Sequence, residues 1–170
     1  LRTNIKEAEA IVAEVMSRLR DPKRIERRNN DPDRAAESII VVTFNLQQKE
    51  LITELFNHLD PDLFEVATKP TKVDDESERD FPAQVKIRNL ENVQGDEAET
   101  VIFSVAFSKT EDGKFPMNWG PVTALGGDRR LNVAVTRAQY EMIVYASFLP
   151  NEMQSGGKTL SPNAKMVYNF

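Results

Sequence analysis

Short runs of apolar, mostly β-branched residues place the tightest constraint on how this 170-residue chain folds. Residues 38–43, 100–106 and 141–146 form such runs. Continuous runs of this kind predict strands that are buried on both faces, as in a parallel sheet covered by helices. Residues 85–90 alternate like a strand, and residues 63–68 predict a further short strand. We therefore expect the chain to build its core around a sheet.

Helical patterns separate these strands. Asn4 and Glu7 have the spacing of a capping box, with Asn4 as the N-cap and Glu7 reaching back to it. Apolar residues then recur at helical spacing, which predicts a helix over residues 5–19 that ends before Pro22. A helix after the first strand has an apolar face made of Leu46, Leu51, Ile52, Leu55 and Phe56. Helices alternating with strands favour a three-layer α/β fold with a mostly parallel sheet.

Composition excludes several classes of protein. The net charge of −5 argues against a surface that binds nucleic acid over its whole extent, so any polyanion must bind in a local groove. The chain has no cysteine, which excludes a disulfide framework and a thiolate metal site and fits a reducing compartment. No apolar run approaches membrane-spanning length. We expect a cytoplasmic protein with no membrane partner and no metal site, and we assign no role to the single histidine, His58.

Two charged stretches have open interpretations. Residues 22–37 are either a basic contact for nucleic acid or a solvated loop or short surface helix, and the interspersed acidic residues favour the second. The acidic run at 74–80 lacks the turn glycine of an EF-hand loop, so we expect a solvated loop there.

The chain is expected to form one domain over residues 1–150, followed by a linker or tail over 151–170. It begins at Leu1 without an initiator methionine, which suggests a piece of a longer protein. Residues 108–127 predict a loop, packed by side chains of its own that include Phe115, Met117 and Trp119.

Two arginines mark the stretch that follows this loop. Asp128 is the expected N-cap of an amphipathic helix that extends to Ala138. Arg130 and Arg137 are two turns apart and would share one edge of that helix. Arginine stays protonated and offers a planar fork of donors, which suits it to charge on a transferred phosphoryl group. The alternative is a surface helix with solvated arginines.

A glycine turn lies between two of the expected strands. Gly95 has no Cβ, so a backbone N–H there can approach a phosphate closely. Glu97 follows it and could accept hydrogen bonds from a ribose hydroxyl. The alternative is an ordinary β-turn with an exposed acid. No Gly-x-x-x-x-Gly-Lys-Ser/Thr phosphate loop occurs in the chain, so these residues would form only half of a nucleotide site.

The order of these motifs resembles that of superfamily 1 helicases. Residues 43–48, 92–99 and 131–138 resemble motifs IV, V and VI of the 5′-to-3′ branch that contains the nonsense-mediated-decay helicase. The resemblance covers residues 4–147, and residues 119–130 are similar to bacterial multidomain members of this branch. It implies the second, C-terminal RecA-like domain of such a helicase.

The resemblance implies roles for residues of motifs V and VI. Arg137 would be the arginine finger that meets the γ-phosphate of ATP bound mainly on the first RecA-like domain. Gly95 would approach the γ-phosphate and Glu97 the ribose, while Gln94 would couple the nucleotide state to the nucleic-acid groove. Arg130 matches the arginine before the motif VI helix.

Other matches and departures concern motif IV and the nucleic-acid contacts. Gln48 matches the motif IV glutamine, and Thr43 begins that motif. Asn89 stands where a Ser or Thr of the family often contacts the nucleic-acid backbone. Members usually have Asp at Glu91 and Phe at Val93.

The resemblance also implies cofactors and partners. ATP and Mg²⁺ would be held mainly by an N-terminal RecA-like domain of the same polypeptide, and the domain pair would step along single-stranded nucleic acid, with DNA favoured over RNA. We expect residues 1–170 alone neither to hydrolyse ATP nor to bind it tightly. The rival interpretation is a RecA-like scaffold that binds nucleic acid or protein without hydrolysis.

Overall fold

A four-stranded parallel sheet forms the centre of the computed structural model, which describes residues 3–72, 80–108, 120–149 and 152. The strand order is β4-β1-β5-β6. The strands are β1 (Ile39–Thr43), β4 (Val85–Asn89), β5 (Ala98–Ser104) and β6 (Ala138–Tyr145). These strands were all expected from the sequence.

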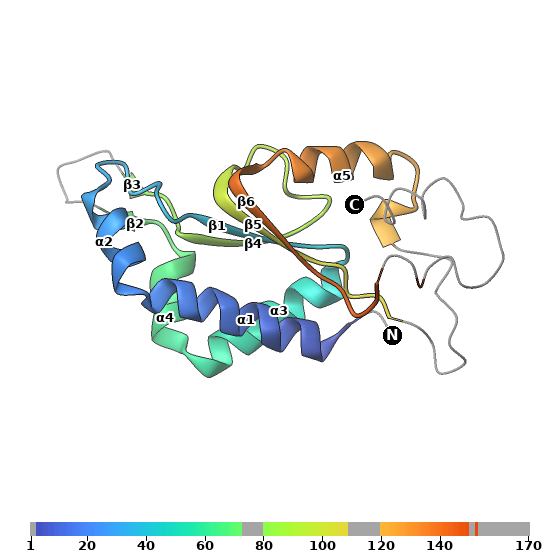
Figure 1. The fold of residues 1–170 in the computed structure, drawn as a ribbon, viewed down its shortest axis with the longest axis horizontal. Coiled ribbons are helices and arrows are strands. Elements are labelled where there is room, and N and C mark those ends of the chain that lie inside the picture. Colours follow the sequence, from blue (N-terminus) through green and yellow to red (C-terminus); the bar gives the residue numbers. More distant parts are fainter. Residues whose placement is uncertain (1–2, 73–79, 109–119, 150–151, 153–170) are drawn as a thin grey trace.

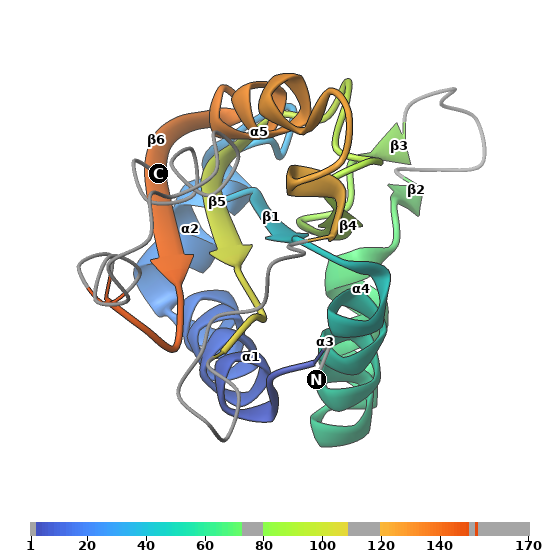
Figure 2. The ribbon, with the colours of Figure 1, turned by 90° about the vertical axis from the view of Figure 1, so that its right-hand side faces the viewer.

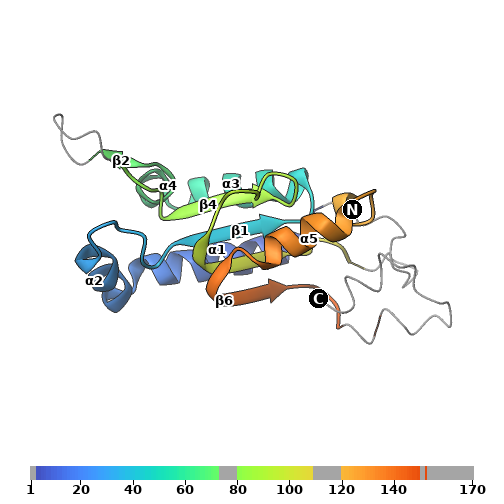
Figure 3. The same ribbon diagram turned by 90° about the horizontal axis from the view of Figure 1, so that it is seen from above.

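Helices cover both faces of this sheet. One face carries α1 (Ile5–Arg20), α3 (Leu46–Leu59) and α4 (Pro61–Thr68), and the other carries α5 (Gly127–Val135) with the 3₁₀ turn η1 (Gly120–Val122), as Figures 1 and 2 show. Seen from above, α5 runs lengthwise over the sheet (Figure 3). The arrangement confirms a three-layer α/β fold of the RecA-like kind.

Smaller elements lie at the end of the sheet where β1 begins. The helix α2 (Pro22–Asn30) has no buried residue, so the expectation of a short surface helix in the charged stretch is confirmed. A two-stranded antiparallel ladder joins β2 (Thr71–Lys72) to β3 (Asp80–Phe81). Figure 1 shows both at the end where β1 begins.

Two apolar clusters, one on each face of the sheet, form the core. All five residues of the central strand β1 are buried, as expected for a strand with helices on both sides. Each fully buried aliphatic or aromatic side chain contributes about 1.5–3 kcal/mol. The largest fully buried apolar side chains are Phe44, Phe56, Phe103, Ile11, Ile40, Ile52, Leu90 and Ile102.

The strand predicted over residues 63–68 is wrong, because these residues belong to the helix α4. Asp60 caps that helix by accepting a hydrogen bond from the Leu63 N–H at 3.0 Å, and Pro61 occupies its first turn. The Phe64 ring then packs edge-on against Phe56, with centroids 5.3 Å apart. A short apolar run fits both the periodicity of a helix and that of a strand, so it cannot distinguish the two. Here the capping residues favour a helix.

Both predicted ends of the last helix are wrong as well. Its N-cap is Gly126, with φ +76° and no side-chain capping bond, and Asp128 lies inside the first turn. A Cβ on Gly127 would lie 1.9 Å from the Val122 carbonyl oxygen, so this helix begins in a contact that only glycine permits. The helix ends at Val135, and Ala138 is already the first residue of β6.

Some expectations concern residues that the structure does not describe. The packing of Phe115, Met117 and Trp119, most of the acidic run 74–80, and the tail after residue 150 except Glu152 lie outside the described residues. Across the described ranges, no helix is both long and apolar enough to cross a membrane. The same ranges contain no group of three or more His, Asp or Glu residues that could hold a metal ion.

Candidate functional site

The predicted site residues lie at opposite ends of the parallel sheet. Gly95, Glu97 and Arg137 lie just before β5 and β6 begin, at what we call the amino edge. Thr43 and Asn89 end β1 and β4 and pair with each other, at what we call the carboxyl edge. The loop 90–97 connects the two edges, because it leaves the end of β4 and enters the start of β5.

A tight turn presents Gly95 at the amino edge. The Asp96 N–H donates to the Val93 carbonyl at 3.3 Å, and Gly95, the third residue of the turn, has φ +87°. A type II turn requires a positive φ at this position, which explains the glycine. A Cβ built on Gly95 would meet no described atom within 4 Å, so the turn faces open space. The neighbouring side chains of Gln94 and Glu97 are exposed.

Arg137 lies directly beside this turn. Its carbonyl oxygen accepts a hydrogen bond from the Ala98 N–H at 3.1 Å, which joins the residue after Glu97 to the connection between α5 and β6. Its guanidinium donates from Nε to the Val133 carbonyl at 2.9 Å and from Nη2 to Thr136 Oγ1 at 3.2 Å. Among the described residues no carboxylate pairs with it. The backbone of Arg137 is thus joined to the strand that follows the glycine turn, and its guanidinium has no carboxylate partner within the described part of the chain.

Arg130 faces a different part of the molecule. Its Nη1 donates to the carbonyl oxygens of Pro121 at 3.4 Å and Leu125 at 3.1 Å, so it holds the segment that precedes α5. The prediction that Arg130 and Arg137 share one helix edge is wrong, because the helix ends two residues before Arg137. A contact of Arg130 with nucleotide stays a prediction.

Gln48 is fully buried at the carboxyl edge. Its Oε1 accepts from the Asn4 N–H at 2.7 Å, and its Nε2 donates to the Asn4 carbonyl at 3.0 Å and to Ser104 Oγ at 3.1 Å. The amide therefore joins the start of α1 to the end of β5. The structure does not bring Gln48 to the amino edge, and its contact with nucleotide stays a prediction.

Glu7 lies in the same buried polar cluster, which sequence reasoning missed. Its carboxylate accepts from the Ala106 N–H at 2.8 Å and from the hydroxyls of Ser104 at 3.0 Å and Ser147 at 3.1 Å. Burial raises the pKa of Glu7, although these hydrogen bonds oppose the rise. Asn4 does cap α1, but Glu7 does not reach back to its backbone N–H, because Gln48 occupies that group. No local pattern could reveal partners so distant along the chain.

The predicted nucleic-acid contacts are also buried. Thr43 Oγ1 donates to the Asn45 carbonyl at 2.8 Å. Asn89 Oδ1 and Asn45 Nδ2 are buried and find no hydrogen-bond partner among the described residues. Leaving such a group unpaired costs about 1–3 kcal/mol, so the described residues leave one buried acceptor and one buried donor unsatisfied at the carboxyl edge.

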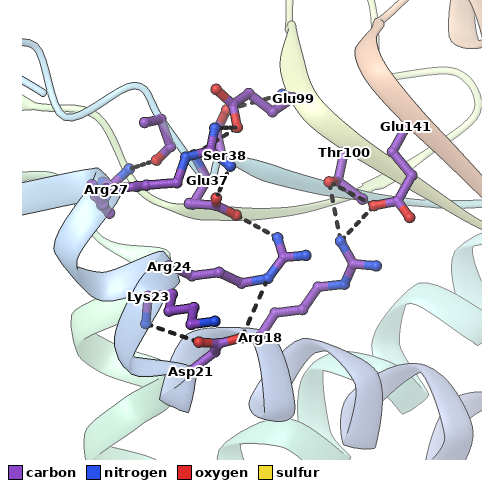
Figure 4. Close-up of polar contacts among 12 residues, drawn as sticks. Arg18, Asp21, Lys23, Arg24, Arg27, Glu37, Ser38, Glu99, Thr100 and Glu141 are labelled. Atoms are coloured by element: carbon purple, nitrogen blue, oxygen red, sulfur yellow. Dashed lines mark hydrogen bonds and ion pairs between the residues drawn. The ribbon is translucent and has the colours of Figure 1, made fainter.

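A network of ion pairs occupies the side of the amino edge next to α2 (Figure 4). Arg24 and Arg27 both pair with the buried carboxylate of Glu37, and Arg27 also approaches Glu99 at 3.5 Å. These arginines of the charged stretch 22–37 are thus neutralised by carboxylates of the same chain. Their arrangement agrees with a surface helix anchored to the sheet.

A second ion-pair cluster lies closer to β6. Arg18 donates to Glu141 at 2.6 Å and to Thr100 Oγ1 at 3.3 Å, so it links α1 to β5 and β6 (Figure 4). It pairs also with Glu14 on its own helix at 2.6 Å. The cluster fastens α1 to one face of the sheet. The turn at Gly95 lies toward the other face.

A parallel sheet covered by helices on both faces, in a chain without a phosphate loop, has the features of a RecA-like α/β domain. Comparison with known proteins agrees. A model for a family described as AAA domain (AAA_12) matches residues 2–148. The chain therefore belongs to this family.

Two curated relatives carry helicase names. They are the uncharacterized ATP-dependent helicase MG140 of Mycoplasma genitalium and the MG140 homolog of Mycoplasma pneumoniae. Each is 32% identical over 108 residues, which is 64% of this chain and 9% of the relative. The chain is thus a helicase-like domain that spans less than a tenth of the length of these relatives.

Proposed function

We propose that this chain is the C-terminal RecA-like motor domain of a bacterial superfamily 1 helicase of the 5′-to-3′ branch, and that Arg137 is its arginine finger. The hydrogen bond between the Ala98 N–H and the Arg137 carbonyl carries the proposal, because it holds the motif V turn and the motif VI arginine together. The names of the two relatives support an ATP-dependent helicase as the parent protein.

The residues present fit one side of an ATP site. Gly95 faces open space, and the Arg137 guanidinium has no carboxylate partner among the described residues. The chain contains no phosphate loop, so ATP and Mg²⁺ are assigned mainly to an N-terminal RecA-like domain of the same polypeptide. ATP bound there supplies the γ-phosphoryl group that is transferred to water.

The proposal assigns a role in nucleotide binding or hydrolysis to residues of the amino edge. Arg137 uses its remaining N–H donors to stabilise negative charge on phosphate oxygens, which arginine does well because its fork is rigid and always protonated. Gly95 brings a backbone N–H to the phosphates, and Glu97 accepts from the ribose hydroxyls. Gln94 couples this turn to bound nucleic acid. Arg130, which lies on α5 away from this turn, is assigned to nucleotide binding on the resemblance to motif VI.

The carboxyl edge is assigned to single-stranded nucleic acid, with DNA favoured over RNA. Thr43 and Asn89 end adjacent strands there, and the unpaired Asn89 Oδ1 supports a further partner. Gln48 supports the motif IV segment by fixing the start of α1. Residues 1–150 are assigned to the motor domain of a cytoplasmic protein, and residues 151–170 to a linker or tail.

The test is ATP hydrolysis by the full-length protein, stimulated by single-stranded DNA, with wild type beside Arg137→Ala. Loss of an arginine finger lowers turnover by about 10³–10⁵-fold. Arg137→Lys keeps the charge without the fork and should restore only part of the rate. Arg20→Ala removes an exposed arginine paired with Asp60 on the opposite face and should retain wild-type turnover.

Equal rates for wild type and Arg137→Ala would contradict the finger role. A full-length protein without hydrolysis would instead favour the non-hydrolysing scaffold. The chain of 170 residues alone should hydrolyse no ATP, because the phosphate loop and Mg²⁺ site belong to the other domain.

A further inference from the structure

The turn of Gly95 is fastened to β4, the strand that precedes it in the chain, by an acidic side chain with no role in the function proposed above. Asp96 Oδ1 pairs with Lys86 Nζ at 2.6 Å, and its Oδ2 pairs with Arg88 Nε at 2.8 Å. Lys86 and Arg88 are two residues apart on β4, so both side chains project from the same face of the strand. Because each carboxylate oxygen has its own cation, the pairs fix the orientation of Asp96 as well as its position.

A second anchor holds the chain immediately after the turn. The Ala98 N–H bonds to the Arg137 carbonyl, and Ala98 is buried at the start of β5. Between this anchor and Asp96 lies a single residue, Glu97, whose side chain is exposed. The positions of Gly95 and Glu97 therefore depend on the Asp96 pairs, because the hydrogen bond that closes the turn is long, at 3.3 Å.

We propose that Asp96 is a positioning residue for the nucleotide site, which acts through Lys86 and Arg88 to hold the Gly95 N–H and the Glu97 carboxylate toward bound ATP. This role rests on the function proposed above for the turn and for Arg137. It adds three residues to the site, none of which touches the reacting atoms.

The charges of this cluster suit the role. A lone aspartate next to a polyphosphate would repel it, whereas one carboxylate with two cations leaves a net charge of +1. The Asp96 side chain is only 15% exposed, and partial burial raises its pKa. The hydrogen bonds from Lys86 and Arg88 outweigh burial and hold the pKa of Asp96 below its usual range, so the carboxylate stays ionised.

The first measurement is the ATP dependence of hydrolysis by the full-length protein carrying Asp96→Asn. A displacement of about 1 Å at a reacting group can cost about 10²-fold, so we expect kcat/KM for ATP to fall about ten- to a hundredfold. Most of the loss should appear in KM, since Arg137 remains in place. Asp96→Glu keeps both cations paired and should recover part of the loss.

The matched control is Glu65→Gln on α4. Glu65 pairs with Lys69 at 2.6 Å, the same distance as the Lys86–Asp96 pair, but both partners are well exposed and lie away from the turn. Breaking this pair should leave KM and kcat unchanged, because exposed pairs contribute little.

Hydrogen–deuterium exchange without nucleotide gives an independent readout. Asp96→Asn should speed exchange of the amides of residues 94–97, while Glu65→Gln should leave them at the wild-type rate. Combining Asp96→Asn with Lys86→Gln and Arg88→Gln should cost no more kcat/KM than Asp96→Asn alone, since all three residues act as one unit.

Wild-type kcat/KM in Asp96→Asn, together with a collapse in Arg137→Ala, would overturn the positioning role and leave the proposed function intact. Faster exchange in Asp96→Asn without a kinetic effect would also overturn it, because the turn would then be held for stability alone. A full-length wild type that hydrolyses no ATP would overturn both proposals.

Discussion

The two edges of the sheet use polar side chains in opposite ways. At the carboxyl edge, Glu7 and Gln48 are buried, and each makes three or more hydrogen bonds to groups far along the chain. At the amino edge, the bonds that the structure describes for the Arg137 guanidinium go to Val133 and Thr136, both near it in the chain, and Glu97 is exposed. At the carboxyl edge the polar groups are used in hydrogen bonds that join elements, whereas at the amino edge polar groups stay accessible at the surface.

This difference separates residues that hold the fold from residues that can serve a ligand. Gln48 and Arg137 both fall within family motifs, so motif membership alone does not distinguish the two groups. Gln48 lies in the stretch that resembles motif IV, yet its amide is committed to Asn4 and Ser104. Substitutions of Glu7 and Gln48 at the carboxyl edge should therefore act on stability, and those of Gly95 and Arg137 at the amino edge on turnover.

The largest effect on folding should come from Gln48→Leu. It leaves the Asn4 N–H and Ser104 Oγ without their buried partner, at about 1–3 kcal/mol for each group. We expect the free energy of unfolding to fall by about 2–4 kcal/mol in urea titration of residues 1–170. A loss below about 1 kcal/mol would show that the buried cluster does not hold the carboxyl edge.

Gly95→Val should have a smaller effect on folding and a clear effect on turnover. The site has room for a Cβ, so the cost comes from the positive φ, at about 1–2 kcal/mol. In the full-length protein the side chain would cover the N–H that the proposal directs at phosphate. Gly126→Val has a comparable φ of +76° away from the amino edge, and it tests whether strain alone lowers turnover.

Opposite pH dependences should distinguish the two edges. The raised pKa of Glu7 means that the folded chain binds its proton more tightly, so this contribution to stability is lost as pH rises above the ordinary value of 4.5. The lowered pKa of Asp96 gives stability above the ordinary value of 3.8 that is lost as pH falls. Urea titrations between about pH 3 and 7 should show wild type losing stability relative to Glu7→Gln with rising pH, and gaining relative to Asp96→Asn. Parallel curves for all three proteins would contradict this assignment.

The smallest effect should follow Arg20→Ala. Arg20 is 58% exposed and pairs with Asp60 at 2.6 Å on the surface of the helical layer. Exposed pairs contribute at most about 1 kcal/mol, so we expect a change within about 0.5 kcal/mol by urea titration. A larger loss would mean that surface pairs contribute to the fold as much as the buried cluster does.

Most of the fold could be predicted because buried parallel strands and amphipathic helices leave strong periodic signals. The run at β1 and the apolar face of α1 are examples, and both elements appear where they were expected. The helix α4 was missed because its eight residues fit either periodicity, and only Asp60 with Pro61 reveals a helix start.

The candidate site could be predicted as a set of residues but not as an arrangement. Gly95 and Arg137 do lie together, yet Arg137 does so from a turn after α5, because that helix ends at Val135. The partners of Glu7 and of Asp96 were not predictable, since they depend on contacts between strands rather than on local spacing. Roles toward nucleotide and nucleic acid stay predictions.

The strand order has a consequence for how the protein is made. The apolar strand β1 pairs with β4 and β5, and 41 residues (44–84) separate its end from the start of β4, the first of these partners to be made. At about 5–20 residues per second, a ribosome needs roughly two to eight seconds to deliver that partner. During this interval the most apolar segment of the nascent chain has no sheet to join, so its protection falls to α1, which has already emerged, and to chaperones.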